Sequence, residues 1–194
     1  VKVLSVPKKD KGQDIKDNRP ISLLQVPAKI FESILHSDIF SQVKTTLVPN
    51  NMISLAYADV LGEMDRGAQV DAVYTDFQKA FDKVHHQISL LKIGINELSK
   101  NTFQFFRAYL QDRYQYVSYK GYESKRFYCP SGIPQGSNLR PLLFTIFIND
   151  VADSITSFQV LLYADDIKLH RSVQTEEEAS LLQRDLDTLI LSLE

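Results

Sequence analysis

The feature that most constrains this chain is a pair of adjacent aspartates inside an apolar, strand-like stretch. Asp165 and Asp166 follow Leu161-Leu162-Tyr163-Ala164 and precede Ile167. A tight turn between two strands usually carries Asn-Gly or Asp-Gly, and two neighbouring carboxylates repel each other unless a cation compensates them. The sequence therefore predicts a hairpin whose turn presents metal ligands. Because aspartate is also a common turn residue, an ordinary turn is the alternative for the pair taken alone.

A third acidic position follows a second predicted strand. Residues 70–75 are rich in β-branched and aromatic side chains, and Asp76 comes at the end of this run. Three carboxylates from two strands would suit Mg²⁺, which prefers oxygen ligands. Two such ions can bind the attacking and leaving oxygens of a phosphoryl transfer. The alternative is that Asp76 caps the helix that follows it.

Composition narrows the class of protein. The chain has 194 residues, of which 44% are hydrophobic and 24% charged, as expected of a globular domain. The single Cys129 excludes an internal disulfide and a cysteine-rich zinc site, and it fits a reducing compartment. Since no run of about eighteen apolar residues occurs, no membrane span is expected. The sequence carries no signal for an oligomeric state.

The charges are unevenly distributed. The net charge of −2 by itself argues against nucleic-acid binding. However, residues 1–30 hold seven basic against three acidic side chains, a net of +4, whereas residues 175–194 hold one against six, a net of −5. The basic segment is able to face phosphates. Its alternative is an ordinary solvated surface.

Periodicity predicts an α+β fold with a mostly antiparallel sheet packed on helices. Strands are expected at 1–6, 70–75, 114–119, 126–129, 160–163 and 167–170, and loops at 8–20, 45–52 and 130–136. Helices are expected at 28–43, 79–92, 99–111, 139–151 and 175–193. In the last helix, Thr175 and Glu178 form a capping-box pattern.

Two further features suggest phosphate contacts. Residues 131–136 read Ser-Gly-Ile-Pro-Gln-Gly, and a glycine-bracketed loop that opens a helix lets backbone amides approach an anion. Lys8, Lys9, Lys11 and Arg19 would suit a triphosphate. A plain loop remains the alternative for both. No metal role is expected for His85 and His86, which do not share a helix face, and no catalytic role for Cys129.

Four motifs follow one another along nearly the whole chain, with two shorter ones between them, Tyr109-Leu110-x-x-Arg113 and Phe147-Ile148-Asn149-Asp150. The four read Asn18-Arg19-Pro20-Ile21-Ser22-Leu23-Leu24, Tyr74-Thr75-Asp76-Phe77-x-Lys79-Ala80-Phe81-Asp82-Lys83-Val84, Ser131-Gly132-Ile133-Pro134-Gln135-Gly136-Ser137 and Tyr163-Ala164-Asp165-Asp166. This series resembles the reverse transcriptases of LINE-type non-LTR retrotransposons. Its order makes the resemblance specific.

The resemblance implies a right-hand polymerase with partial fingers at 1–70, an internal deletion near 50–57, a palm at 71–194 and no thumb. It implies an RNA-directed DNA polymerase that adds deoxynucleoside triphosphates to the 3′-hydroxyl of a DNA primer on an RNA template. Such an enzyme would act inside the cell, in the nucleus and cytoplasm, and away from membranes.

The resemblance also implies the site residues. Asp76, Asp165 and Asp166, with the carbonyl of Phe77, would hold two Mg²⁺ ions, for which Mn²⁺ substitutes. Asp76 and Asp165 would ligate both ions, with Asp166 more peripheral. The implied nucleotide-binding residues are Lys8, Lys9, Arg19, Phe77, Ala80, Phe81, Gln135 and Gly136. Among them, Phe81 would lie under the sugar and clash with a ribose 2′-hydroxyl.

Several positions depart from the family pattern. Residues 48–61 lack the usual Gly-Phe-Arg-x-x-Arg-Ser segment, and 91–95 look shortened. Asn18 stands for a common Tyr and Leu191 for a typical Trp. Arg140 replaces a Gly, which would cost on the order of 1 kcal/mol if that position had positive φ.

These departures suggest a truncated or decayed copy and keep a second function open: an inactive remnant with at most weak nucleic-acid binding. A third hypothesis is an RNA-templated RNA polymerase. Phe81 argues against it, because a ribonucleotide needs room at that position.

Overall fold

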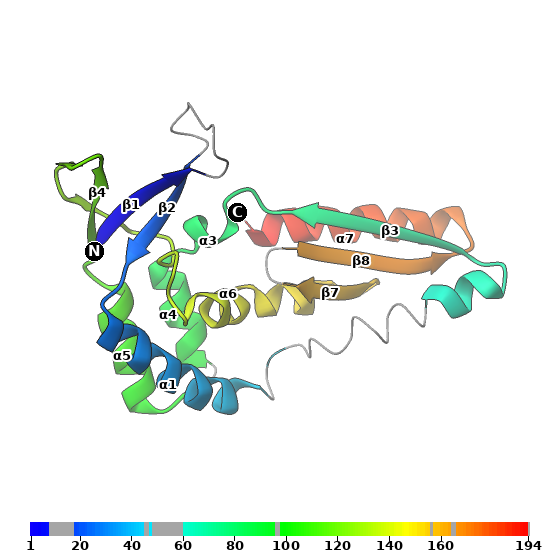
Figure 1. The fold of residues 1–194 in the computed structure, drawn as a ribbon. Coiled ribbons are helices and arrows are strands. Elements are labelled where there is room, and N and C mark those ends of the chain that lie inside the picture. The colour runs from blue at the N-terminus through cyan, green and yellow to red at the C-terminus, as the bar shows by residue number, and fades with distance from the viewer. Residues whose placement is uncertain are drawn as a thin grey trace. The chain divides into compact units, whose positions relative to one another are not determined.

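The computed structural model describes residues 1–7, 18–44, 47, 60–95, 98–155, 157–163 and 166–193. Lys8, Lys9, Lys11, Asp165 and the expected deletion near 50–57 lie outside these ranges. The chain forms two compact units that interleave in sequence (Figure 1). The first unit comprises Val1–Lys44 and Phe81–Phe147, and the second comprises Thr45–Ala80 and Ile148–Glu194.

The first unit contains a five-stranded sheet. Its strands are β1 (Lys2–Pro7), β2 (Asn18–Leu23), β4 (Tyr114–Tyr119), β5 (Tyr122–Glu123) and β6 (Phe127–Tyr128). They run in the order β2-β1-β4-β5, with β6 also paired to β4, and only the β1–β4 pair is parallel among these described strands. The predicted hairpin after residue 114 is confirmed. The predicted loop at 8–20 is wrong for residues 18–20, because pairing with β1 makes them a strand.

Five helices accompany this sheet in sequence: α1 (Val26–Val43), α3 (Ala80–Lys83), α4 (His86–Ile95), α5 (Lys100–Leu110) and α6 (Arg140–Ile148). The predicted helix at 79–92 is interrupted, because His85 forms a β-bridge with Ser131. Ser99 caps α5, its hydroxyl accepting the N–H of Thr102 at 3.2 Å. The other predicted helices of this unit are confirmed.

The face that α1 buries is set by tertiary packing. Ile39 and Val43 are fully buried and Glu32 is 3% exposed, whereas Ile30 and Ile34 are 59% and 66% exposed. The helical spacing of the sequence thus predicts the helix correctly. The buried stripe runs through 32, 39 and 43, so part of the apolar pattern faces outward. The remaining core of the unit comes largely from α5 and α6.

The second unit is a three-stranded antiparallel sheet with one long helix. Its strands are β3 (Gln69–Asp76), β7 (Gln159–Tyr163) and β8 (Asp166–Val173), in the order β3-β8-β7. Residues 60–65 are helical, η2 (Asn149–Ser154) is a 3₁₀ helix, and α7 (Glu176–Leu193) packs on η2 and β8. Figure 1 shows the three strands side by side along α7. The predicted strands and final helix are confirmed.

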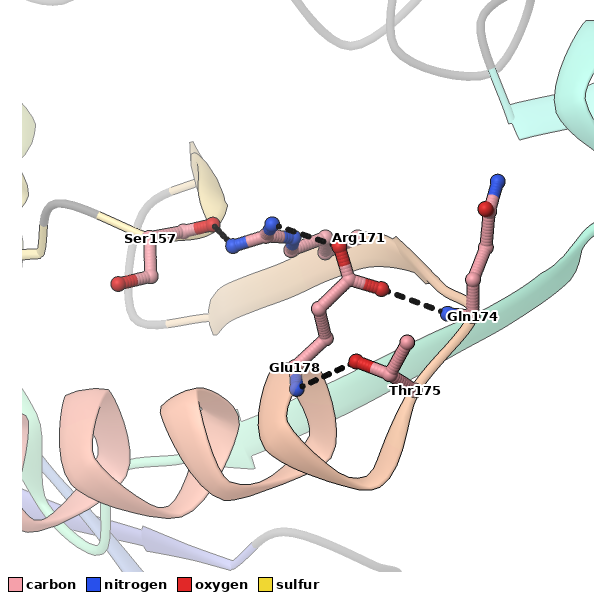
Figure 2. A network of polar contacts seen from close by, with 5 residues as sticks. All are labelled: Ser157, Arg171, Gln174, Thr175 and Glu178. Atoms are coloured by element: carbon pink, nitrogen blue, oxygen red, sulfur yellow. Dashed lines mark hydrogen bonds and ion pairs between the residues drawn. The ribbon is translucent and has the colours of Figure 1, made fainter.

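A polar network fixes the start of α7 (Figure 2). The Thr175 hydroxyl accepts the N–H of Glu178 at 3.2 Å, which confirms the predicted cap. The Glu178 carboxylate accepts the N–H of Gln174 at 2.7 Å, one residue before the capping residue, and pairs with Arg171 at 3.2 Å. Arg171 also donates to the carbonyl of Ser157 at 3.0 Å. The N–H of Gln174, followed by the Arg171 charge, lowers the pKa of Glu178.

The fold is therefore α+β, as predicted, with mainly antiparallel pairing among the described strands. None of the helices in the described part of the chain has the length and apolar run of a membrane span. The expected fingers at 1–70 and palm at 71–194 divide the chain once, whereas the compact units interleave. The fingers and palm assignment stays a prediction.

Candidate active site

Two of the three predicted aspartate positions meet across neighbouring strands. Asp76, the last residue of β3, is the register partner of Asp166, the first residue of β8. Asp166 is in turn the partner of Tyr163 across the β7–β8 hairpin. Residues 164 and 165 therefore connect the two strands of that hairpin, although Asp165 lies outside the described residues.

Directly opposed positions in an antiparallel pair have Cβ atoms about 4.5–5.5 Å apart, and like charges there destabilise the sheet. Opposed acidic positions at the ends of two strands are therefore unfavourable for the sheet unless their charge is compensated. Within the described ranges, no group of three His, Cys, Asp or Glu side chains is poised to hold a metal. Asp165 lies outside these ranges, so the three-carboxylate site stays a prediction.

Lys168 and Tyr74 flank this acidic pair. They are register partners two residues along the ladder from positions 76 and 166. Because successive residues alternate between faces, all four positions share one face. The Lys168 ammonium lies 4.9 Å from the centre of the Tyr74 ring, which is 69% exposed. No motif in the sequence marks this pair. The two-residue spacing of Asp166 and Lys168 on a strand was the available signal.

Phe77 and Ala80 continue the chain beyond β3. The N–H of Ala80 donates to the carbonyl of Phe77 at 3.3 Å. A carbonyl oxygen has two lone pairs, so this bond leaves the Phe77 carbonyl able to accept one more partner.

The loop at 130–136 is tied to two other motifs of the chain. Gly132 donates its N–H to Val84 at 2.8 Å, and Ile133 donates to Phe81 at 3.0 Å. On the other side, the N–H of Ser22 in β2 donates to Gln135 at 2.9 Å. The sequence suggested that backbone amides of this loop bind an anion. The amides of Gly132 and Ile133 instead donate to carbonyl groups within the protein, and these bonds hold the loop in place.

Two glycines of this loop allow its close approaches. Gly132 has φ +88°, and a Cβ there would lie 3.0 Å from the carbonyl oxygen of Asp82. Gly136 has φ +103°, and a Cβ would lie 3.4 Å from the carbonyl oxygen of Ser22. The loop therefore packs by backbone against both α3 and β2, which only glycine permits without strain.

His86 and Cys129 both lie next to this loop. The His86 ring donates to the carbonyl of Gly132 at 2.8 Å, and burial lowers the pKa of His86. Burial likewise raises the pKa of the Cys129 thiol. His86 is thus one more support of the loop.

A buried polar cluster secures the end of the same loop. The Ser137 hydroxyl donates to the Glu32 carboxylate at 3.0 Å and accepts from Tyr109 at 2.8 Å and from the N–H of Leu139 at 3.1 Å. Glu32 also accepts the N–H of Asn138 at 2.9 Å. No motif in the sequence marks Glu32. Its spacing of seven and eleven residues from Ile39 and Val43 was the signal that it shares their buried stripe.

Tyr109 joins this cluster to the motif that ends at Arg113. Burial raises the pKa of Tyr109 to about 12. The Arg113 guanidinium lies 5.3 Å from the centre of the Tyr109 ring and donates to the carbonyl of Tyr109 at 3.5 Å. The tyrosine is therefore held neutral and fixed from both ends.

Phe81 is packed against α6. Its ring centre lies 4.5 Å from that of Phe144 and 4.4 Å from the guanidinium carbon of Arg140. Arg140 is the first residue of α6 and is not among the described residues with positive φ. The condition for backbone strain at Arg140, a positive φ, is therefore not met, because the helix gives this position an ordinary conformation.

The predicted site residues thus fall into two sets. Phe81, Gln135 and Gly136 lie in the first unit around the loop, where Gln135 bonds to β2 three residues beyond the exposed Arg19. Asp76, Phe77, Ala80 and Asp166 lie in the second unit. Lys8, Lys9 and Asp165 are outside the described residues.

Comparison with known proteins points the same way. The family described as reverse transcriptase (RNA-dependent DNA polymerase) matches residues 6–192. The RNA-directed DNA polymerase from mobile element jockey of Drosophila funebris is 29% identical over 195 residues, covering 90% of this chain and 21% of that protein. The probable RNA-directed DNA polymerase from transposon BS of Drosophila melanogaster is 28% identical over 212 residues, covering 96% of this chain and 23% of that protein. The chain spans about a fifth of the length of these relatives.

Solved structures agree in fold. Apo telomerase from Candida tropicalis, truncated from the C-terminal domain, has a TM-score of 0.62 at 12% identity, over 88% of this chain and 44% of that one. Telomerase from Candida albicans, in complex with a fragment of telomeric RNA, has a TM-score of 0.55 at 12% identity, over 86% of this chain and 31% of that one. The predicted relationship to the polymerases of LINE-type elements is confirmed by the Drosophila relatives. The chain belongs to the reverse transcriptase family.

Proposed function

We propose that this chain acts as an RNA-directed DNA polymerase, adding deoxynucleotides to the 3′-hydroxyl of a DNA primer paired to an RNA template. The observation that carries the proposal is the register of β3 and β8, which makes Asp76 and Asp166 direct partners where β8 begins. In a member of the reverse transcriptase family, paired acidic positions at strand ends favour nucleotidyl transfer over a structural role.

The acidic positions fit a pair of divalent ions. Asp76, Asp165 and Asp166, with the carbonyl of Phe77, offer the oxygen ligands that Mg²⁺ prefers, and Mn²⁺ would substitute. Bound there, two ions would lower the pKa of the primer hydroxyl and neutralise the triphosphate. The protein's own contribution is to hold the acidic positions on a paired sheet, so that little reorganisation is needed when cations bind.

Most of the proposed nucleotide-binding residues lie in the first unit, whereas Ala80 lies in the second. Arg19, with Lys8 and Lys9, would hold the triphosphate, since arginine offers a bidentate fork to phosphate oxygens. Ala80, Gln135 and Gly136 would contact the incoming nucleotide, and Phe81 would exclude the ribose 2′-hydroxyl. This assignment is supported by the hydrogen bonds that fix the 130–136 loop to Phe81 and to β2.

The template and primer would be held mainly by their backbones. Base pairing reads the template sequence, so the protein needs few contacts to base edges. On this proposal, residues 1–70 act as fingers and 71–194 as palm, and the enzyme works in the nucleus and cytoplasm.

Primer extension on an RNA template, with deoxynucleotides and Mg²⁺ or Mn²⁺, tests the proposal. Replacing Asp76 by Asn should lower the extension rate on the order of 10²-fold or more, because the isosteric amide lacks the negative charge that the proposed role requires. Asp71→Asn is the matched control: it lies on the same strand, its carboxylate bonds to Gln69, and extension should persist. If the unaltered chain extends no better than Asp76→Asn, it is the inactive remnant.

A further inference from the structure

We propose that Arg140 is a positioning residue for sugar selection, acting through Phe81. Its guanidinium holds the ring of Phe81 in the place from which that ring excludes a ribose 2′-hydroxyl. The inference rests on the nucleotide-binding role proposed for Phe81. It concerns a side chain that departs from the glycine of the family pattern.

Contacts to ring and backbone hold Phe81. The ring lies against Arg140 and Phe144, at 4.4 and 4.5 Å. These residues are four apart on α6, so they present one face of the helix to the ring. The carbonyl of Phe81 also accepts the N–H of Ile133. Backbone and ring are therefore both fixed, and Arg140 supplies the only cationic contact to the ring among the described residues.

The position of Arg140 is unfavourable for the helix itself. A cation in the first turn opposes the helix dipole, and no acidic residue lies in the first turn of α6. Nη1 of Arg140 is shielded from solvent. Removing a guanidinium from water costs free energy. Stacking on an aromatic face offsets this cost, because the ring attracts the cation and the planar group can lie flat on it. The side chain is thus better explained by its contact with Phe81 than by helix stability.

Selection against a single extra oxygen depends on a ring that cannot turn away. A modest rotation of an aromatic side chain costs little, so an unsupported ring would accommodate a 2′-hydroxyl. The start of α6 is itself anchored, because the Ser137 hydroxyl binds both the N–H of Leu139 and Glu32. Arg140 therefore contacts the ring from a helix end that is itself fixed, and this contact restricts rotation of the ring.

The test measures the ratio of deoxy- to ribonucleotide incorporation for the whole chain and its variants. Phe81→Ala should remove most of the selection. Arg140→Ala should lower the ratio roughly 3- to 10-fold, the range expected for one cation–π contact, and Arg140→Lys should restore only part of it. Arg107→Ala is the matched control, an exposed helical arginine that bonds to Gln111, and should leave the ratio unchanged.

The double variant decides the mechanism. If Arg140 acts through the ring, Phe81→Ala with Arg140→Ala should be no less selective than Phe81→Ala alone. A further loss in the double variant would mean that Arg140 acts on the nucleotide directly, which overturns the inference. An unchanged ratio in Arg140→Ala, together with relaxed selection in Phe81→Ala, would also overturn it while leaving the polymerase proposal intact.

Nucleotide binding separates the two proposals. The dissociation constants of a deoxy- and a ribonucleoside triphosphate, measured with Mn²⁺ by thermal shift, should differ for the unaltered chain and converge in Arg140→Ala. A chain that binds selectively without extending primers refutes the polymerase proposal but supports the role of Arg140. A chain that binds both triphosphates equally, or neither, overturns the inference.

Discussion

At the scale of single residues, the hydroxyl of Ser137 connects three helices. It bonds to Glu32 of α1, to Tyr109 of α5 and to the N–H of Leu139 just before α6. A hydroxyl has one donor and two acceptor sites, so these three bonds satisfy it completely. The cluster is therefore a closed set of partners in which the neutral form of Tyr109 is required as a donor.

Tyr109 predicts a loss of stability at high pH. Its pKa is about 12 in the folded chain against an ordinary 10.0. Because the raised value favours the protonated form in the folded state, the stability contribution is complete below pH 10 and is lost as the pH rises to 12. The loss is about 2 to 3 kcal/mol. Urea unfolding between pH 8 and 12 measures it.

Tyr109→Phe removes the titrating group. It should cost about 1 kcal/mol below pH 10, where the bond to Ser137 is lost. Because the unaltered chain then loses about 2 to 3 kcal/mol on titration, the order should reverse, with Tyr109→Phe the more stable near pH 12. Tyr122→Phe is the control, since Tyr122 is 83% exposed and should follow the unaltered chain. A constant gap between Tyr109→Phe and the unaltered chain would contradict the assignment.

At the scale of elements, the 130–136 loop depends on the absence of a side chain at Gly132. Gly132→Ala should destabilise the chain by roughly 2 to 4 kcal/mol, because positive φ strains alanine and the new Cβ meets a backbone oxygen at 3.0 Å. Gly121→Ala is a matched control with φ +85° and nothing within 4 Å of the new Cβ. It should cost about 1 kcal/mol. Equal losses in urea unfolding would exclude the close approach as the cause.

The network at the start of α7 predicts an acid sensitivity of the second unit. The pKa of Glu178 is lowered in the folded chain from its ordinary value of 4.5. Its contribution to the free energy of unfolding is therefore present above pH 4.5 and is lost as the pH falls through the folded pKa. Glu178→Gln should therefore be less stable near neutrality and approach the unaltered chain in acid. Thermal unfolding from pH 7 to 3 checks this. Asp187→Asn, an exposed helix position bonded to Gln183, serves as control.

Periodicity in the sequence was sufficient to predict most elements, but not what each one faces. The strand at 70–75 and the helix at 28–43 follow from local pattern alone. Residues 18–20 do not follow from local pattern, because a segment that contains Arg19 and Pro20 becomes a strand only by pairing with β1. Glu32 and Arg140 were also beyond the local pattern: one is buried by partners from α5 and the loop, and the other is held by the ring of Phe81.

The acidic site illustrates the same limit. The motif order indicated that Asp76 and the Asp165–Asp166 turn belong together, but only the strand register pairs position 76 with 166. A one-residue slip would have moved the partner to the opposite face. The flanking Lys168 and Tyr74 then follow from that register and not from any motif.

At the scale of the whole molecule, the balance of charge limits nucleic-acid affinity. The chain carries a net −2, although residues 1–30 have a basic excess of +4 and residues 100–140 one of +5. Binding to an RNA–DNA hybrid should therefore be weak and sensitive to salt, with a slope of about −0.9 for each neutralised phosphate. Fluorescence anisotropy at several salt concentrations measures the slope.

Reversing the charges of Lys8 and Lys9 to Glu should flatten that slope by about two units, because two phosphate contacts are lost. Lys100→Glu, at the start of α5, is the control and should leave the slope nearly unchanged. Equal effects of the two changes would mean that only net charge matters.

The interleaving of the two units has a consequence for dissecting this chain into fragments. β8 is the central strand of its sheet, bonded by β7 on one edge and on the other by β3, which comes from far earlier in the chain. A piece beginning at Ile148 would keep only a two-stranded hairpin and α7, with the β8 edge bare. Such hairpins are marginal alone, and open edges recruit other chains. No single cut separates the units intact, so a soluble form of the second would need a permuted gene in which β3 is joined after α7.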